Sequence, residues 1–177
     1  MEGVTLEFVP LGDAEADLVQ SFARDAARVY GLPHTVAAEP LPLPPAAFDP
    51  KREQYLADRL LAELKLRSTP ANTHLLAITD ADITVGDMNF LFGLADMPGN
   101  IAVMSLHRLR PKRRTEEAAD LLLQRAVKIA VHELGHTFGF RHCPNEKCVM
   151  HYADTAFGVD LTDRTFLPPM RIPHPVE

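Results

Sequence analysis

The stretch HELGHTFGFRHCPNEKCVM, residues 132–150, decides the interpretation of this 177-residue chain. Its first half contains three histidines, at positions 132, 136 and 142. Residues four apart share one face of a helix, so His132 and His136 can present two imidazoles to one ion. Gly139 can take a positive φ, which would end the helix and carry His142 back to the same ion.

These imidazoles and the neighbouring carboxylate have the chemistry of a catalytic zinc site. Three neutral histidine ligands leave the fourth position of a tetrahedral Zn²⁺ open, which is typical of catalytic zinc. Glu133 lies ~100° round the helix from His132, where it can reach a metal-activated water without ligating the metal. We predict Zn²⁺ bound by His132, His136 and His142, with Glu133 as the general base in peptide-bond hydrolysis. Two surface histidines and one loop histidine are the alternative, which leaves the three-part spacing unexplained.

Composition and charge narrow the function classes. The net charge of −6 argues against general affinity for nucleic acid or membranes. No stretch approaches the ~18 apolar residues of a membrane span, and the N-terminus does not resemble a signal peptide. With two cysteines, Cys143 and Cys148, the chain is not a disulfide scaffold. We expect a cytoplasmic protein that acts on a peptide or protein and binds neither nucleic acid nor membrane.

Strand and helix signals alternate along most of the chain. Strands are expected over residues 4–9, 36–38, 75–78, 88–94 and 101–106, and helices over residues 13–30, 50–66 and from 115 into the histidine motif. This alternation predicts an α/β (α+β) fold, with a mixed sheet packed on helices, in a single domain spanning residues 1–177. The last helix is long and apolar, so we expect it to be a buried, rigid support for metal ligands.

Two charged segments have more than one interpretation. Asp80 and Asp82 follow a predicted strand, where they are either turn-capping residues or part of a cation site. The basic segment 108–114 is a solvated loop, a rim that attracts acidic substrates, or a nucleic-acid patch. The acidic total favours the solvated loop, and turn capping is the commoner role for such aspartates.

Residues 132–150 resemble the archaemetzincins, zinc peptidases of the metzincin clan. The family signature is HExxHxxGxxxC, followed after four residues by CxM. This stretch matches it without a gap. Segments RxQY (52–55), MNFLFGLAD (88–96) and SLHRL (105–109), and the Asp80–Asp82 turn, are also similar to the family. The resemblance implies a metzincin-like zincin fold with a twisted sheet, whose active-site helix is followed by a small C-terminal subdomain with a Met-turn. The upper part would span about residues 1–139 and the lower part about 140–177.

The second cysteine pair of the family is missing. The signature continues with seventeen residues and CxxC, but positions 168 and 171 hold proline and arginine here. In the family, four cysteines are thought to hold a second, structural zinc. Cys143 and Cys148 alone cannot complete a four-ligand site, and His151 or His174 would be needed as replacements. We expect one catalytic zinc and no second ion, with the two thiols free or joined in a disulfide.

The resemblance assigns roles to two residues that follow the histidines. Met150 corresponds to the methionine that metzincins place under the metal in a tight turn, where it packs and does not ligate. Tyr152 is similar to a tyrosine of the astacin Met-turn that stabilises an oxyanion; a packed tyrosine without that role is the alternative. By the same resemblance, residues 88–94 would form the upper rim of the cleft, where a strand edge binds an extended peptide.

Two other functions are compatible with the sequence. One is a zinc-binding protein with weak or no peptidase activity, in a regulatory or specialised processing role, because the missing cysteines would loosen the lower part of the cleft. The other is a binding module that uses the basic segment 108–114, for which salt-dependent binding of nucleic acid would be evidence.

Overall fold

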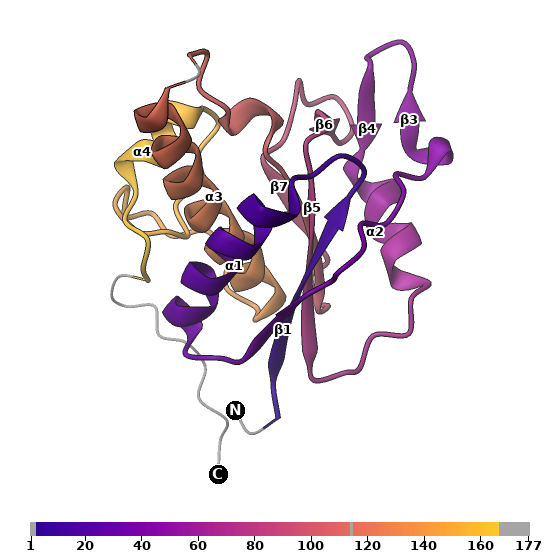
Figure 1. Cartoon of the computed structure of the whole chain (residues 1–177), viewed down its shortest axis with the longest axis horizontal. Coiled ribbons are helices and arrows are strands. Elements are labelled where there is room, and N and C mark those ends of the chain that lie inside the picture. Colours follow the sequence, from indigo (N-terminus) through magenta and orange to yellow (C-terminus); the bar gives the residue numbers. More distant parts are fainter. Residues whose placement is uncertain (1–2, 114, 167–177) are drawn as a thin grey trace.

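The computed structural model describes residues 3–113 and 115–166, in which two sheets and four helices form a mixed α/β fold (Figure 1). The larger sheet has the strand order β2–β1–β5–β8–β7. Four of its strands are parallel, and β7 is antiparallel to β8. The strands are β1 (Thr5–Leu11), β2 (His34–Val36), β5 (Thr73–Thr79), β7 (Gly93–Ala95) and β8 (Ile101–Ser105).

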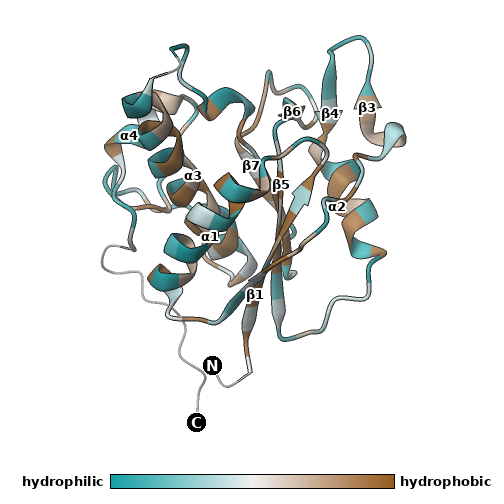
Figure 2. Cartoon of the chain, viewed as in Figure 1, coloured by the Kyte–Doolittle hydropathy of each residue, from teal (hydrophilic) through white to brown (hydrophobic). Residues whose placement is uncertain are grey.

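Helices cover both faces of this sheet (Figure 1), which explains why most residues of the central strands β1, β5 and β8 are apolar and buried. On one face lie α1 (Ala16–Tyr30) and α3 (Glu116–Thr137), and on the other lies α2 (Ala57–Lys65). The alternation along β1 serves both cores: Leu6 and Phe8 pack toward α1 and α3, and Val9 packs toward α2. Figure 2 shows apolar residues along the strands and polar residues on the outer sides of the helices.

A smaller sheet of order β3–β4–β6 stands beside α2. Its strands are β3 (Phe48–Asp49), β4 (Gln54–Leu56) and β6 (Ile83–Thr84), and short 3₁₀ helices η1 (Pro45–Ala47) and η2 (His107–Leu109) precede β3 and follow β8. The prediction that a helix begins at residue 50 was wrong. Asp49 caps a turn by accepting a bond from the Lys51 N–H at 2.9 Å, and strand pairing holds residues 54–56 extended.

Two further predicted elements differ in extent. The first helix begins at Ala16 after Glu15, not at Asp13, and ends at Gly31, which has a φ of 66°. Of the predicted strand 88–94, only its end belongs to a strand, because β7 starts at Gly93. Residues 85–92 instead form turns with one isolated bridge, between Ile83 and Leu91.

After α3 the chain forms turns before the short helix α4 (Ala156–Leu161). Among the described residues, no helix is long and apolar enough to cross a membrane. The division into an upper and a lower part near residue 139 stays a prediction.

Candidate metal centre

Helix α3 and the turn after it bring the three histidines together. His132 is buried, His136 is half-buried, and both lie on one face of the helix. The helix ends at Thr137, and Gly139 takes a φ of 87°, so the chain turns and returns His142 to the same point. One ligand atom from each of the three imidazoles lies within 4.8 Å of the others.

Hydrogen bonds fix the orientation and the tautomer of two of these rings. The Nδ1 atom of His132 lies 2.8 Å from the carbonyl oxygen of Val149, and that of His136 lies 2.7 Å from the carbonyl oxygen of Phe140. A carbonyl oxygen only accepts, so each Nδ1 carries the proton and each Nε2 carries a lone pair.

The two Nε2 atoms are 3.0 Å apart, so two lone pairs face each other. This arrangement is repulsive unless a cation lies between the rings. Carbonyl partners on the outer nitrogen are also the usual support of histidine ligands. The residues present therefore fit a zinc ion, which His132, His136 and His142 would hold.

The surroundings favour the neutral, metal-binding form of these imidazoles. Burial, with a smaller contribution from the nearby His136, lowers the pKa of His132 to about 3. Burial also lowers the pKa values of His136 and His142. Metal binding competes with protons for these nitrogens, so the lowered pKa values reduce that competition.

Glu133 lies between α3 and the edge strand β7. Its side chain is buried, and burial raises the pKa of the carboxyl to about 8. The carboxyl packs against Gly93, where a Cβ atom would overlap the Glu133 carboxyl group. Gly93 therefore leaves the space that this carboxylate occupies, a role that sequence reasoning missed. The glycine of MNFLFGLAD was the available signal, but its partner lies forty residues further along the chain.

Met150 lies directly beneath the histidine-bearing turn of α3. Its side chain is fully buried, and a Cβ at Gly135 would be 2.5 Å from the Met150 sulfur. Gly135 thus allows Met150 to pack against the helix between the first two histidines in sequence.

Backbone hydrogen bonds hold the segment from Cys143 to Met150 in place. The Cys143 N–H donates to the Met150 carbonyl at 2.8 Å, and the Asp163 N–H donates to the Lys147 carbonyl at 2.7 Å. The Val149 carbonyl, one residue before Met150, is the partner of His132. This segment is consequently tied both to itself and to a predicted ligand.

The two cysteines are buried and are not joined in a disulfide. His151 directs its Nδ1 to the Cys143 carbonyl oxygen at 3.0 Å. Within residues 3–113 and 115–166, the three predicted ligands are the one group of metal-ligating side chains that meets. His174, the other predicted replacement, lies outside the described residues.

A cleft of about 590 Å³ opens over the histidines. Tyr152, which is 51% exposed, lines this cleft. The centre of its ring lies 5.3 Å from the centre of the His142 ring. The opposite wall is formed by residues 85–95 and is mostly apolar. Tyr152 is therefore at the cleft, next to a predicted ligand.

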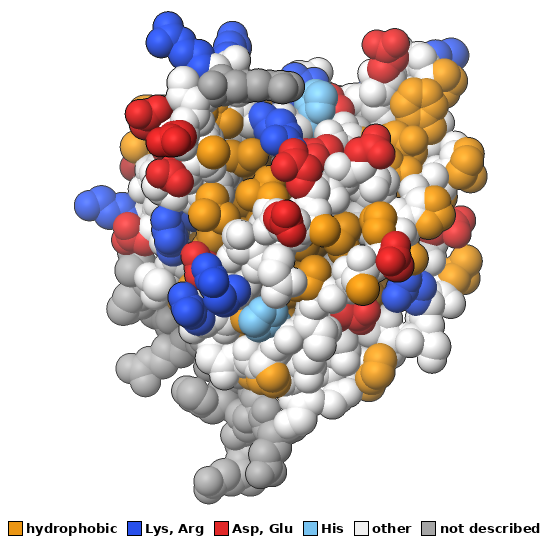
Figure 3. Space-filling view, viewed as in Figure 1, with side chains coloured by type: hydrophobic (Ala, Val, Ile, Leu, Met, Phe, Trp, Pro, Cys, Tyr) orange, Lys and Arg blue, Asp and Glu red, His pale blue; other side chains and the backbone are white. Residues whose placement is uncertain are grey.

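The charged segments pair with each other. Arg108 contacts Asp82 at 2.5 Å, and Arg110 contacts Asp80 at 2.7 Å. On the face shown in Figure 3, acidic and basic side chains are interspersed. The two arginines and the two aspartates thus form ion pairs across the turns, which explains why both kinds of residue are present there.

Comparison with known proteins agrees with this site. The model of Peptidase family M54 matches residues 24–169, which include all three histidines and Glu133. The chain is a zinc metallopeptidase. It is 35% identical to the archaemetzincin of Pyrococcus furiosus over 160 residues, covering 86% of this chain and 83% of that protein. It is 34% identical to the archaemetzincin of Natronomonas pharaonis over 162 residues, covering 89% of this chain and 92% of that protein.

Solved structures show the same fold. The archaemetzincin of Methanopyrus kandleri has a TM-score of 0.82 and 32% identity, over 95% of this chain and 92% of that one. That of Archaeoglobus fulgidus, complexed with malonate, has a TM-score of 0.80 and 28% identity, over 93% and 96%. The chain belongs to the archaemetzincin family, which confirms the predicted family and α/β fold class.

Proposed function

We propose that this protein hydrolyses peptide bonds with Glu133 as the general base, at a centre that holds one zinc ion. One observation carries the proposal. The Nε2 atoms of His132 and His136 lie 3.0 Å apart with their lone pairs facing each other, and the buried carboxyl of Glu133 lies beside them in an open cleft. When bound, zinc supplies Lewis acidity, which makes water more acidic and polarises a carbonyl group.

The residues of the chain supply the remaining steps. Glu133 accepts a proton from the attacking water and transfers it to the leaving amine, because its carboxyl lines the cleft beside the three histidines. Tyr152 stands at the cleft, where its hydroxyl can donate to the developing oxyanion. The substrate is a peptide or protein segment, extended along the edge strand β7 that lines the cleft.

Replacement of Glu133 by glutamine tests the proposal. Glu133→Gln keeps the shape but cannot accept the proton, so kcat on a peptide library falls by about 10²- to 10⁴-fold while zinc content stays unchanged. Glu116→Gln, at the exposed start of the same helix, is the matched control and keeps parental activity. If Glu133→Gln and the parent have equal activity and both retain zinc, the peptidase function is contradicted and a zinc-binding regulator is supported. Tyr152→Phe, assayed alongside, lowers kcat if the hydroxyl stabilises the oxyanion and leaves it unchanged if the ring only packs.

A further inference from the structure

The cleft wall formed by residues 85–92 lacks the regular pairing of a strand. Its own backbone bonds include that from the Met88 N–H to the Val85 carbonyl at 3.1 Å and that from Leu91 to Ile83 at 2.8 Å. The carbonyl groups of Gly86, Met88 and Asn89 instead accept hydrogen bonds from side chains of a distant segment. The position of this wall therefore depends on those side chains.

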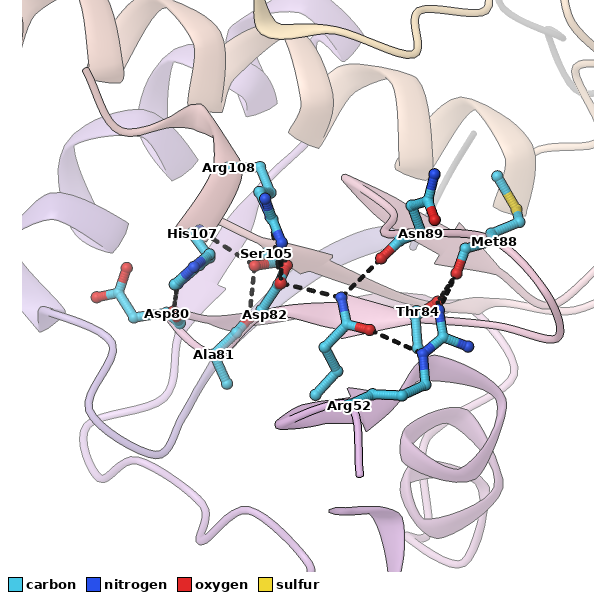
Figure 4. Close-up of polar contacts among 11 residues, drawn as sticks. Arg52, Asp80, Ala81, Asp82, Thr84, Met88, Asn89, Ser105, His107 and Arg108 are labelled. Carbon is cyan, nitrogen blue, oxygen red and sulfur yellow. Dashed lines mark hydrogen bonds and ion pairs between the residues drawn. The ribbon is translucent and has the colours of Figure 1, made fainter. Parts of the chain in front are cut away.

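Arg52 supplies the first of these contacts (Figure 4). Its guanidinium donates to the Gly86 carbonyl at 2.9 Å, to the Met88 carbonyl, and to the Thr84 hydroxyl oxygen at 3.1 Å. The Thr84 hydroxyl donates to the same Met88 carbonyl at 2.6 Å. A planar guanidinium can hold several acceptors in fixed directions, which an ammonium group cannot do.

Gln54 supplies the next contact, two residues further along. Its side chain is buried, and its Nε2 donates to the Asn89 carbonyl at 2.8 Å and to Asp82 at 2.9 Å. Its Oε1 accepts a bond from the Arg52 Nε at 3.1 Å. All polar atoms of this amide are thus in use, and the amide fixes Arg52 relative to the wall.

Asp82 and Arg108 continue the network to an aromatic residue of the cleft. Arg108 donates to both carboxylate oxygens of Asp82, at 3.0 and 2.5 Å. Its guanidinium also lies 5.1 Å from the centre of the Phe90 ring, which lines the cleft and packs on Phe92. The network therefore contacts the wall through both its backbone and one of its side chains.

The substrate side of the wall is mostly apolar, although Asp87 and Asn89 also line the cleft. Met88, Phe90 and Leu91 line the cleft opposite the histidines. In Figure 4 the side chains of Met88 and Asn89 point away from Arg52, so the network holds the rear of the wall. Among the described residues, no hydrogen bond joins this network to the three histidines.

We propose that Arg52 and Gln54 are positioning residues, which hold residues 86–90 in the shape that binds an apolar side chain of the peptide. This inference rests on the proposed peptidase function. The network joins four segments that are far apart in the sequence: residues 52–54, 82–84, 86–90 and 108. Their convergence on one wall gives all four a common role that the zinc centre alone does not explain.

The test compares Arg52→Met and Arg52→Lys with a matched control. Arg59→Met is that control, since Arg59 also donates to one backbone carbonyl, that of Ala46 at 2.8 Å, away from the cleft. Each zinc-loaded variant is measured for zinc content, amide hydrogen exchange of residues 86–92, and kcat and KM on a peptide with a bulky apolar side chain.

The expected result is faster exchange in residues 86–92 and an about tenfold higher KM for Arg52→Met, with kcat and zinc content close to parental. The KM of Arg52→Lys lies between those of the parent and Arg52→Met, because an ammonium group can donate to one or two of the carbonyls. Arg59→Met changes neither readout. Unchanged exchange in Arg52→Met would overturn the positioning role whether or not the protein is a peptidase.

The two proposals fail in different ways. A parent without activity above Glu133→Gln contradicts the peptidase function, and the exchange measurement still decides whether Arg52 holds the wall. An active parent whose KM is unchanged in Arg52→Met contradicts the role in substrate binding. A fall in kcat together with loss of zinc would also overturn it, because the network would then support the metal centre.

Discussion

At the scale of single residues, Gly93 determines how closely strand β7 approaches the carboxylate of Glu133. A Cβ at position 93 overlaps the carboxyl group, so any other residue there must displace Glu133 or the strand. Because Glu133 is buried, there is little room for it to move. The glycine is needed for space and not for an unusual backbone angle.

Gly93→Ala tests this contact through stability. We expect the variant to lose about 1–3 kcal/mol of unfolding free energy because the new methyl group overpacks the site. The same substitution in a Glu133→Ala background costs much less, since the carboxyl group is gone. Urea unfolding of the four proteins measures the coupling between the two positions, and equal costs in both backgrounds would contradict it.

Asp82 provides a pH-dependent test. Burial alone would raise the pKa of Asp82, but hydrogen bonds from Arg108 and Gln54 outweigh it and lower the pKa. A carboxyl whose pKa is lowered by folding stabilises the protein above its unfolded pKa, and this contribution is lost as pH falls through the folded pKa. Asp82→Asn therefore lowers stability at neutral pH, and its difference from the parent shrinks below about pH 4.

Denaturation midpoints measured from neutral to acidic pH check this expectation. Asp120→Asn, an exposed site on α3, is the control and shows no such trend. A deficit of Asp82→Asn that stays constant down to low pH would show that the carboxylate charge is not what stabilises this turn.

The spacing of residues in the sequence predicted those parts of the site whose residues lie close together along the chain. The three histidines, Glu133 and Gly139 fall within eleven consecutive residues, so helical periodicity was enough to bring the imidazoles together. Gly93 and Gln54 act on groups that are far away in sequence. No local pattern carries that information, and only similarity to family segments marked their surroundings.

At the scale of elements, α3 supports the metal centre and also anchors the chain that follows it. Arg125 forms a two-pronged ion pair with Asp160, with distances of 2.7 and 2.6 Å. Lys128 donates to the carbonyl groups of Val159 and Asp160, both at 2.9 Å. These contacts attach α4 to α3 one to two turns before His132.

Lys128→Met tests this attachment. Methionine keeps much of the apolar stem, but the hydrogen bonds of the ammonium group to the carbonyls of Val159 and Asp160 are lost, so stability falls by about 1–3 kcal/mol. Lys112→Met, at an exposed position, is the control and changes little. Limited proteolysis should cut the Lys128→Met protein faster between residues 140 and 166, and an unchanged cutting rate would argue against the anchoring role.

The element predictions were correct where periodicity extends over many residues. α1 and α3 were expected from their apolar stripes, and the buried strands β5 and β8 from their apolar runs. The errors lie where tertiary pairing competes with local signals. Residues 54–56 pair with two other strands and delay the start of α2, and side chains of the network replace strand pairing in residues 88–92.

At the scale of the whole molecule, the described structure offers one metal-binding cluster. We therefore expect one zinc per folded chain, measured by elemental analysis of protein after dialysis. His132→Ala and His142→Ala should each lose that ion, whereas Cys143→Ser and Cys148→Ser retain it. Two ions per chain would mean that residues outside the described ranges complete a second site. The predicted cytoplasmic location stays a prediction.

The long-range closure of the cleft has a consequence for biosynthesis. Parallel pairing joins Thr5 to Thr73, Met150 must pack under Gly135, and β7 must close on Glu133 before the wall and the ligands face one another. Contacts so far apart in sequence form slowly. A growing or misfolded chain thus carries the HExxH residues without a competent cleft. The cleft therefore requires completed tertiary folding, and the formation of α3 alone provides His132 and His136 without the wall that faces them.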